Sequence, residues 1–282
     1  MLTVLEIIKR TTDFLAGKGV ENARLNAELL VGHALGLKRM QLYMLFERPL
    51  SEPELETIRP LVRRRGAREP LQYIVGEMEF FGVNLKIDRR ALIPRPETEH
   101  LLALITEKLS AAPARILDLG TGSGAIALGL ARHYPEAKVT AFDVSAEAVE
   151  LTRENIARNQ LADRVTALQS DWFSALDAAA RFELVVSNPP YLTAAEAADT
   201  AAEIRQYEPS LALTPGVTGM EALTPIIAGA RDRLETGGWL ALETGIAQHA
   251  ALAAQLAAQG YTGFESVADL TGRPRFVFAR RP

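Results

Sequence analysis

A chain of 282 residues, of which 48% are hydrophobic, is long enough for one large domain or two smaller ones with a buried core. A net charge of −4 argues against a protein whose main partner is bulk nucleic acid, since phosphate binding normally needs a basic surface. With no cysteine, disulfides, thiolate catalysis and cysteine-ligated metals are excluded, and the four histidines are too scattered to predict a metal site.

The first 75 residues predict a small helical bundle. A first helix carries apolar residues at helical spacing, and a second ends near Gly36. Asn22 is expected to cap the second helix, and Ser51 with Glu54 forms a capping-box pattern before a third, Leu55–Arg65. A bundle of this size is too small for an active site of its own, so we interpret residues 1–75 as a substrate-recognition domain.

The N-terminal residues lack the basic start and the unbroken apolar run of a signal peptide. No stretch approaches the roughly 18 apolar residues needed to span a bilayer. We therefore expect a cytoplasmic protein with no membrane partner.

Residues 76–96 are expected to form a β-hairpin linker. Gln72–Phe81 and Val83–Ile87 are rich in β-branched and aromatic residues, with Gly82 between them. Pro94 and Pro96 then end the hairpin before the second domain.

From residue 97 to 282, strand and helix patterns alternate. This alternation predicts an α/β fold, a Rossmann-like parallel sheet with helices on both faces. Ligands of such sheets bind at the carboxyl ends of the strands, near the topological switch point. The expected strands are Arg115–Leu119, Lys138–Asp143, Val165–Gln169, Glu183–Ser187, Trp239–Glu243 and Arg275–Ala279, and the helices include Glu97–Leu109, Ala125–His133 and Ala146–Asn159.

The first of these strands runs into a glycine-rich turn, Asp118-Leu119-Gly120-Thr121-Gly122-Ser123-Gly124, followed by a helix. Glycines let the backbone approach a ligand closely, and the helix start offers free N–H groups to an anion. With Ala125 and the later Asp143, the segment also satisfies a dinucleotide-binding pattern, which stays open on this segment alone. Asp118 favours S-adenosylmethionine, because it could meet the amino group of the methionine moiety but would repel a pyrophosphate. The glycine spacing also resembles the adenosylmethionine motif of Rossmann-like methyltransferases.

Acidic residues follow the next two strands. Asp143 could accept hydrogen bonds from both ribose hydroxyls, or could instead cap the helix that starts near Ser145. Asp171 and Trp172 could accept from the adenine amino group and stack on its ring, although ordinary core packing of the tryptophan stays open.

The strand Glu183–Ser187 delivers Asn188-Pro189-Pro190-Tyr191 to the same edge of the sheet. The prolines fix the backbone and remove two N–H donors, so the Asn188 side-chain oxygen and the Pro189 carbonyl can both accept from one NH2 group. This pair of acceptors would favour localisation of the delocalised nitrogen lone pair and aim it at a methyl donor, through geometry and preorganised dipoles. Tyr191 could stack on the planar acceptor. We therefore expect methyl transfer to an amide or amine nitrogen.

With these motifs the chain resembles, over essentially its whole length, the PrmC or HemK family of protein-(glutamine) methyltransferases that modify class-1 peptide chain release factors. Supporting matches are the segments Arg68–Gly76, Leu92–Glu99, Tyr207-Glu208-Pro209 and Gly272-Arg273. Glu97 stands where the family usually has Asp, and Gly216–Gly219 departs from the usual pattern, which leaves the conformation of that loop open.

The resemblance implies methyl transfer from S-adenosylmethionine to the glutamine side-chain amide of the Gly-Gly-Gln motif in a class-1 release factor, leaving S-adenosyl-L-homocysteine. It implies cofactor contacts from Asp118, Gly120, Thr121, Gly122, Ser123, Gly124, Asp143, Asp171, Trp172 and Asn188. The acceptor glutamine would be bound by Asn188, Pro189, Pro190 and Tyr191, of which Asn188, Pro189 and Tyr191 would act in catalysis. We expect release factors as partners and a monomeric enzyme.

Methylation of a nucleic-acid adenine is the main alternative, because its exocyclic amine poses the same electronic problem. Such enzymes flip a base out of a duplex and normally carry a basic target-reading region, whereas this chain is acidic. Its one basic cluster is more typical of a solvated helix end than of a nucleic-acid site, and consists of Arg63, Arg64, Arg65 and Arg68. A nicotinamide-dependent oxidoreductase would have no use for Asn188-Pro189-Pro190-Tyr191.

Overall fold

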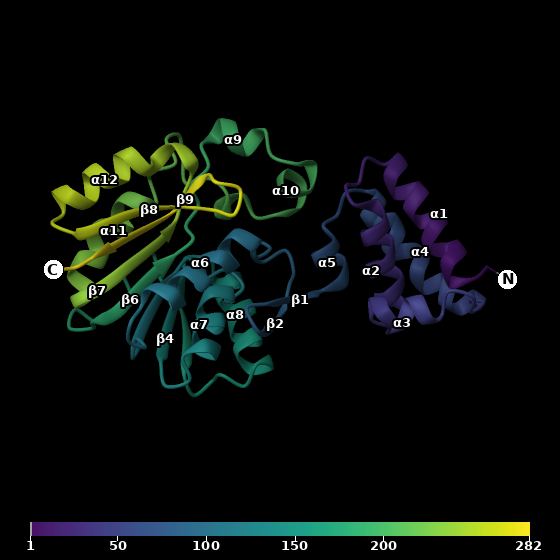
Figure 1. Cartoon of the computed structure of the whole chain (residues 1–282), viewed down its shortest axis with the longest axis horizontal. Coiled ribbons are helices and arrows are strands. Elements are labelled where there is room, and N and C mark those ends of the chain that lie inside the picture. Colours follow the sequence, from purple (N-terminus) through teal and green to yellow (C-terminus); the bar gives the residue numbers. More distant parts are fainter. Residues whose placement is uncertain (1) are drawn as a thin grey trace. The chain divides into compact units, whose positions relative to one another are not determined.

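The computed structural model describes residues 2–282, which form two compact units (Figure 1). The first unit contains the chain up to Glu77 together with Ala201–Tyr207, and the second contains Met78–Thr200 and Glu208–Pro282. Among the described residues no helix is both long enough and apolar enough to cross a membrane.

The first unit is helical. Its buried residues form two clusters, around Ile8 and Val31 and around Leu15 and Leu30. The helices are α1 (Val4–Gly17), α2 (Ala23–Leu35), α3 (Arg39–Met44), α4 (Glu52–Gly66), α5 (Leu71–Val75) and the distant α10 (Ala202–Tyr207). Nothing in the sequence indicated that α10, which follows the methyltransferase motifs, belongs with the N-terminal helices.

Two local predictions for this unit need correction. Asn22 has a left-handed backbone (φ +50°) and makes no side-chain cap, because an N-cap residue needs an extended backbone to reach the first turn. Part of the predicted strand Gln72–Phe81 is the helix α5, which buries Tyr73 and Ile74 and ends at the left-handed Gly76. The capping box before α4 is present, since Glu54 accepts from the Ser51 N–H at 2.9 Å.

The second unit is built on a seven-stranded sheet in the order β5-β4-β3-β6-β7-β9-β8. Its strands are β3 (Arg115–Leu119), β4 (Lys138–Asp143), β5 (Val165–Gln169), β6 (Phe182–Ser187), β7 (Leu234–Glu243), β8 (Thr262–Ala268) and β9 (Pro274–Arg280). All pairs are parallel except those of β9 with β7 and β8. The Rossmann-like α/β prediction is confirmed.

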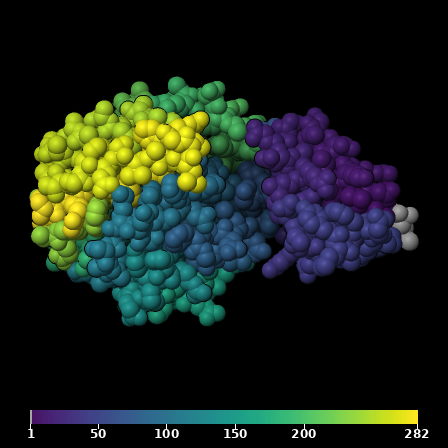
Figure 2. Space-filling model, viewed as in Figure 1, coloured from purple at the N-terminus to yellow at the C-terminus, as the bar shows by residue number. Residues whose placement is uncertain are grey.

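Helices cover both faces of this sheet (Figure 1). One face carries α6 (Pro96–Lys108), α7 (Ala125–His133) and α8 (Ala146–Arg158), and the other carries α11 (Leu223–Arg233) and α12 (His249–Ala258). Three short elements complete the unit, namely the helix α9 (Ala194–Ala198) and two 3-10 turns, Ser210–Ala212 and Ile246–Gln248. The last residues of the chain, yellow in Figure 2, lie at the surface, where β8 forms an exposed edge strand.

The hairpin of β1 (Glu77–Phe80) and β2 (Val83–Lys86) is docked on α8. Asn155 accepts from the Lys86 N–H at 2.6 Å and donates to the Lys86 carbonyl at 3.0 Å. Asn159 makes the same pair of bonds with Asn84, at 3.1 and 2.9 Å. Two asparagines one turn apart thus join the open edge of β2 to the helix.

The chain order reverses beside β3, which pairs with β4 on one side and β6 on the other. A sheet of this kind opens a crevice at the carboxyl ends of those strands. The ends are Leu119, Asp143 and Ser187, which the sequence motifs directly follow.

Candidate active site

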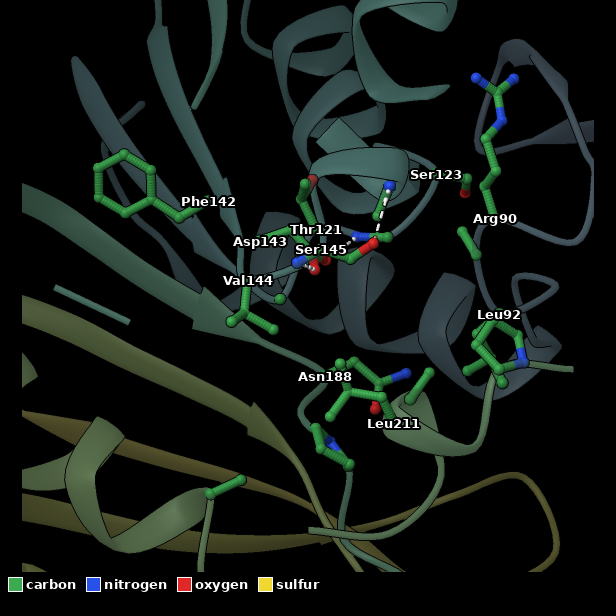
Figure 3. A pocket seen from close by; sticks show the side chains of 18 of the residues that line it. Arg90, Leu92, Thr121, Ser123, Phe142, Asp143, Val144, Ser145, Asn188 and Leu211 are labelled. Carbon is green, nitrogen blue, oxygen red and sulfur yellow. Dashed lines mark hydrogen bonds between the residues drawn. The ribbon is translucent and has the colours of Figure 1, made fainter. Parts of the chain in front are cut away.

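A cavity of about 610 Å³ lies at the carboxyl ends of β3, β4 and β6, within the size range of small-molecule sites (Figure 3). Figure 3 shows Thr121, Asp143 and Ser145 on one side, with Asn188 and Leu211 facing them. Of the residues predicted from sequence, those that line it are Gly120, Thr121, Gly122, Ser123, Asp143, Asp171, Trp172, Asn188 and Pro190. Asp118, Gly124, Pro189 and Tyr191 are not among its lining residues.

The glycine turn has a backbone that only glycine adopts easily. Gly120, Gly122 and Gly124 all have left-handed φ angles, of +72°, +59° and +85°. A Cβ on Gly124 would lie 2.7 Å from a Leu128 methyl group, so this glycine permits close packing of the following helix. The N–H groups of Gly120 and Thr121 both donate to the Phe142 carbonyl, which fixes the turn against the end of β4.

Asp143 ties the glycine turn to the next helix. One carboxylate oxygen accepts from the Gly122 N–H and the other from the Ser145 N–H, both at 2.9 Å. Burial raises the pKa of Asp143, and these N–H donors oppose the rise. Each oxygen keeps a further lone pair for a ligand hydroxyl. The N-cap of α8 is Ser145, whose hydroxyl accepts from the Ala148 N–H, so Asp143 is not the cap, and its contact with a ligand stays a prediction.

Asp118 supports the turn from behind. It is fully buried, and its Oδ2 accepts from the Thr121 hydroxyl at 2.7 Å and the Ala127 N–H at 3.2 Å. Its Oδ1 has no partner among the described residues, and burial raises the pKa to about 7. Because it does not line the cavity, a direct contact with a ligand amino group stays a prediction.

Trp172 lies beside the glycine turn in an uncommon backbone conformation. Its φ of +46° is rare for a bulky residue and is held by the Ser170 hydroxyl, which donates to the Trp172 carbonyl at 2.9 Å. A Cβ built on Gly120 would lie 3.8 Å from the indole, so the ring borders the turn. The neighbouring Asp171 is exposed at the cavity.

Asn188 presents its amide at the opposite side of the cavity. The preceding Ser187 is fully buried and donates to the Leu119 carbonyl at 2.6 Å, which holds the end of β6 against β3. The Asn188 Nδ2 donates to the Thr98 hydroxyl at 3.0 Å. No described residue donates to its Oδ1.

Tyr191 points away from the cavity lining. Its hydroxyl donates to Glu243 at 3.1 Å, and the Arg275 guanidinium lies 5.6 Å from its ring centroid. Its backbone carbonyl accepts from Gln248, which also donates to the Gly219 carbonyl and so fixes the loop whose conformation was open. Stacking of Tyr191 on an acceptor group stays a prediction.

The segment after α10 closes another side of the cavity, which sequence analysis missed. Glu208 is buried and accepts from the Ile93 N–H at 3.2 Å and from Arg95 at 2.5 Å. The residues that follow it, from Pro209 to Pro215, contribute several lining side chains. Glu208 thus joins two segments that the family resemblance covers, Leu92–Glu99 and Tyr207-Glu208-Pro209.

The basic cluster of the first unit is largely paired. Arg65 is buried and donates to Asn26, to the Glu69 carbonyl and to Glu203 of α10. Arg68 donates to both oxygens of Glu203, and Arg64 donates to Glu69. The interpretation as a solvated helix end is therefore wrong for Arg65, because its charge serves internal packing.

Two family models match this chain, the PrmC N-terminal domain over residues 6–76 and the Methyltransferase small domain over residues 97–208. The release factor glutamine methyltransferase of Rhodopirellula baltica is 39% identical over 98% of this chain and 95% of its own length. That of Geobacter sulfurreducens is 40% identical over 99% and 96%, and that of Chlorobaculum tepidum 45% over 86% and 85%.

Solved structures of methyltransferases share the fold. A T. thermophilus 16S rRNA methyltransferase in complex with AdoMet and guanosine has a TM-score of 0.54 at 22% identity, covering 73% of this chain and 50% of that one. A methyltransferase from Pyrococcus furiosus has a TM-score of 0.53 at 20% identity, covering 71% and 90%. At these identities the likeness concerns the fold alone.

Proposed function

The chain belongs to the release factor glutamine methyltransferase family, and we propose that it methylates a release-factor glutamine in the cavity between the glycine turn and Asn188. It is an S-adenosylmethionine-dependent protein-glutamine N-methyltransferase. The observation that carries the choice of site is the Asn188 amide, which faces the cavity and whose oxygen accepts from none of the residues 2–282.

The residues around the glycine turn fit the cofactor. Side chains are absent at Gly120 and Gly122 on the cavity wall, the Asp143 carboxylate retains lone pairs for two hydroxyl groups, and the Trp172 indole offers a surface for a planar ring. When bound, adenosylmethionine supplies an electrophilic methyl group on its sulfonium.

Asn188 and Pro189 would hold the acceptor. The Asn188 Oδ1 and the Pro189 carbonyl each accept one hydrogen of the glutamine NH2, which orients the nitrogen lone pair towards the methyl donor. These acceptors bind more strongly as the nitrogen becomes cationic, so they favour the transition state over the ground state. The N–CH3 bond forms as the S–CH3 bond of the sulfonium breaks, which would leave S-adenosylhomocysteine, and the methylated nitrogen then loses one proton to solvent.

The finer substrate assignment is the glutamine of the Gly-Gly-Gln motif of class-1 release factors. The helices of the first unit would supply recognition of the folded partner, and the enzyme would act as a cytoplasmic monomer. A nucleic-acid substrate is disfavoured because three of the four arginines in the basic cluster are committed to internal partners.

A labelling experiment tests the proposal. The enzyme is incubated with methyl-labelled adenosylmethionine, a class-1 release factor, the same factor with its motif glutamine replaced by alanine, and duplex DNA. Label should enter only the intact release factor. Label in DNA, or equal label in both release factors, would overturn the assignment.

A further inference from the structure

We propose that Thr98 and Glu243 form a hydrogen-bond relay that fixes which end of the Asn188 amide faces the cavity. The inference rests on the proposed role of Asn188 as the acceptor-binding residue. It assigns two positioning residues, neither of which needs to touch the reacting atoms.

The relay runs from the end of β7 to the end of β6 through the first turn of α6. The Asn188 Nδ2 donates to the Thr98 Oγ1 at 3.0 Å, and that hydroxyl donates to the Glu243 Oε2 at 2.7 Å. Thr98 and Glu243 are 4% and 1% exposed, so solvent does not compete for the bond between them, whereas Asn188 is half-buried at the cavity. The fold thus brings together residues that are distant in sequence. Thr98 is 90 positions from Asn188, and Asn188 is 55 positions from Glu243.

The direction of these bonds follows from hydrogen counting. The hydroxyls of Thr98 and Tyr191 each donate to one oxygen of Glu243, so the single hydroxyl hydrogen of Thr98 is committed to the carboxyl group. The threonine oxygen is then left with lone pairs only and requires a donor from its other neighbour. Asn188 meets this need with its NH2 group, which turns its oxygen towards the cavity. The opposite amide orientation would set two acceptors against each other and aim a donor at the substrate NH2.

Other groups hold Glu243 in place. Its Oε1 accepts from the Tyr191 hydroxyl at 3.1 Å. The hydroxyl oxygen of Tyr191 in turn accepts from the Arg275 guanidinium at 3.3 Å. Burial raises the pKa of Glu243, while the bonds from Thr98 and Tyr191 and the charge of Arg275 oppose the rise and Glu97 adds to it. Both carboxylate oxygens are thereby satisfied by donors.

A purely structural role explains this arrangement less well. A buried carboxylate costs free energy even when it is paired, and apolar residues of similar size often replace such groups without loss of stability. A buried carboxylate at the end of a site strand, which is linked through Thr98 to the Asn188 amide on the cavity wall, is better explained by control of that amide.

The test compares variants of the full-length enzyme on a release factor. Thr98→Val removes the hydroxyl at nearly constant shape and should lower kcat by about tenfold or more, with cofactor affinity within twofold of wild type. Thr98→Ser keeps the hydroxyl and should restore kcat to within a few-fold of wild type. Glu243→Gln can donate to Thr98, which reverses the relay, so it should lose kcat as Thr98→Val does.

A double variant separates this inference from the proposed function. If Thr98 acts through Asn188, adding Thr98→Val to Asn188→Ala should lower kcat no further. A loss of kcat in Asn188→Ala with full activity in Thr98→Val would overturn the relay and leave the proposed function standing. The same conclusion would follow if the losses of kcat in the two single variants multiplied in the double variant. Full activity in Asn188→Ala would overturn the proposed function itself. If Glu243→Gln does not fold, the Val and Ser variants of Thr98 still decide the matter.

Discussion

Asp143 binds the glycine turn through Gly122, whose backbone N–H donates to the aspartate Oδ2 at 2.9 Å. The carboxylate that we expect to hold a ribose therefore also shapes the turn beneath it. A second bond, from Ser145, joins the same side chain to the start of α8. Removal of this side chain should disturb the cofactor site in two ways at once.

Asp143→Ala should weaken cofactor binding by at least one charge-assisted hydrogen bond, about 1.5–3 kcal/mol for each bond lost. Calorimetric titration with adenosylmethionine measures the effect, and Asp171→Ala, at an exposed residue of the same cavity, provides a comparison with a smaller expected loss. An affinity of Asp143→Ala within twofold of wild type would contradict the assignment.

Asp118 should give the protein a distinct pH dependence of stability. Burial raises its pKa from 3.8 to about 7, so between these values the folded state holds a proton that the unfolded chain has released. The contribution of Asp118 to the stability of the wild type then falls as the pH rises through this window. Asp118→Asn cannot titrate, and its free energy of unfolding should fall less over the same range. Denaturant titrations of both proteins at a series of pH values test this, and parallel curves would rule it out.

Glu203 should stabilise the first unit through its bonds with Arg65 and Arg68. Glu203→Gln leaves the buried Arg65 without a charged partner, which should cost about 1–3 kcal/mol in the free energy of unfolding. Arg63→Gln, an exposed change on the same helix as Arg65, should stay within about 0.5 kcal/mol of wild type. Urea denaturation measures both, and equal stability of the two variants would show that the pairing contributes nothing.

The parts of the fold that sequence predicted best are those with strong, local patterns. The bounds of Arg115–Leu119, Lys138–Asp143 and Val165–Gln169 agree with the structure. The first two strands are largely buried, whereas Val165–Gln169 lies at the edge of the sheet and starts with alternating buried and exposed residues. Strand β8 was missed because it is exposed along nearly its whole length and shows no alternation of apolar and polar residues. Helix α5 was mistaken for a strand because burial of Tyr73 and Ile74, and not propensity, decides its conformation.

In the candidate site, too, local motifs could be predicted from the sequence and long-range contacts could not. Two contiguous motifs could be recognised from their residue types, namely the glycine turn and Asn188-Pro189-Pro190-Tyr191. The edge of the sheet where they meet could therefore be predicted. Contacts between residues far apart in the chain could not. Thr98 lay within a noted family match and Glu243 ended a predicted strand at the same edge, but only the fold shows that they bind each other. Arg65 with Glu203, 138 positions apart, is a second such case.

Asn188 should carry the chemical step and leave cofactor affinity nearly unchanged. Its amide lies across the cavity from Asp143 and the glycine turn, with Nδ2 bound to Thr98 and Oδ1 free for the acceptor (Figure 3). The bond from the glutamine NH2 to this oxygen strengthens as the nitrogen becomes cationic, so its loss raises the barrier more than it weakens binding.

Asn188→Ala should therefore lose on the order of 10²-fold or more in kcat, as removal of one preorganised polar partner commonly does. Asn188→Asp provides the sharper comparison. It keeps an acceptor for the substrate, but its carboxylate has no hydrogen for the Thr98 oxygen, which already donates to Glu243. We expect it to retain more activity than Asn188→Ala and less than wild type. Steady-state kinetics on a release factor and calorimetric binding of adenosylmethionine measure the two properties separately. Turnover of Asn188→Ala within threefold of wild type, or a parallel loss of cofactor affinity that accounts for the whole effect, would remove Asn188 from the chemical step.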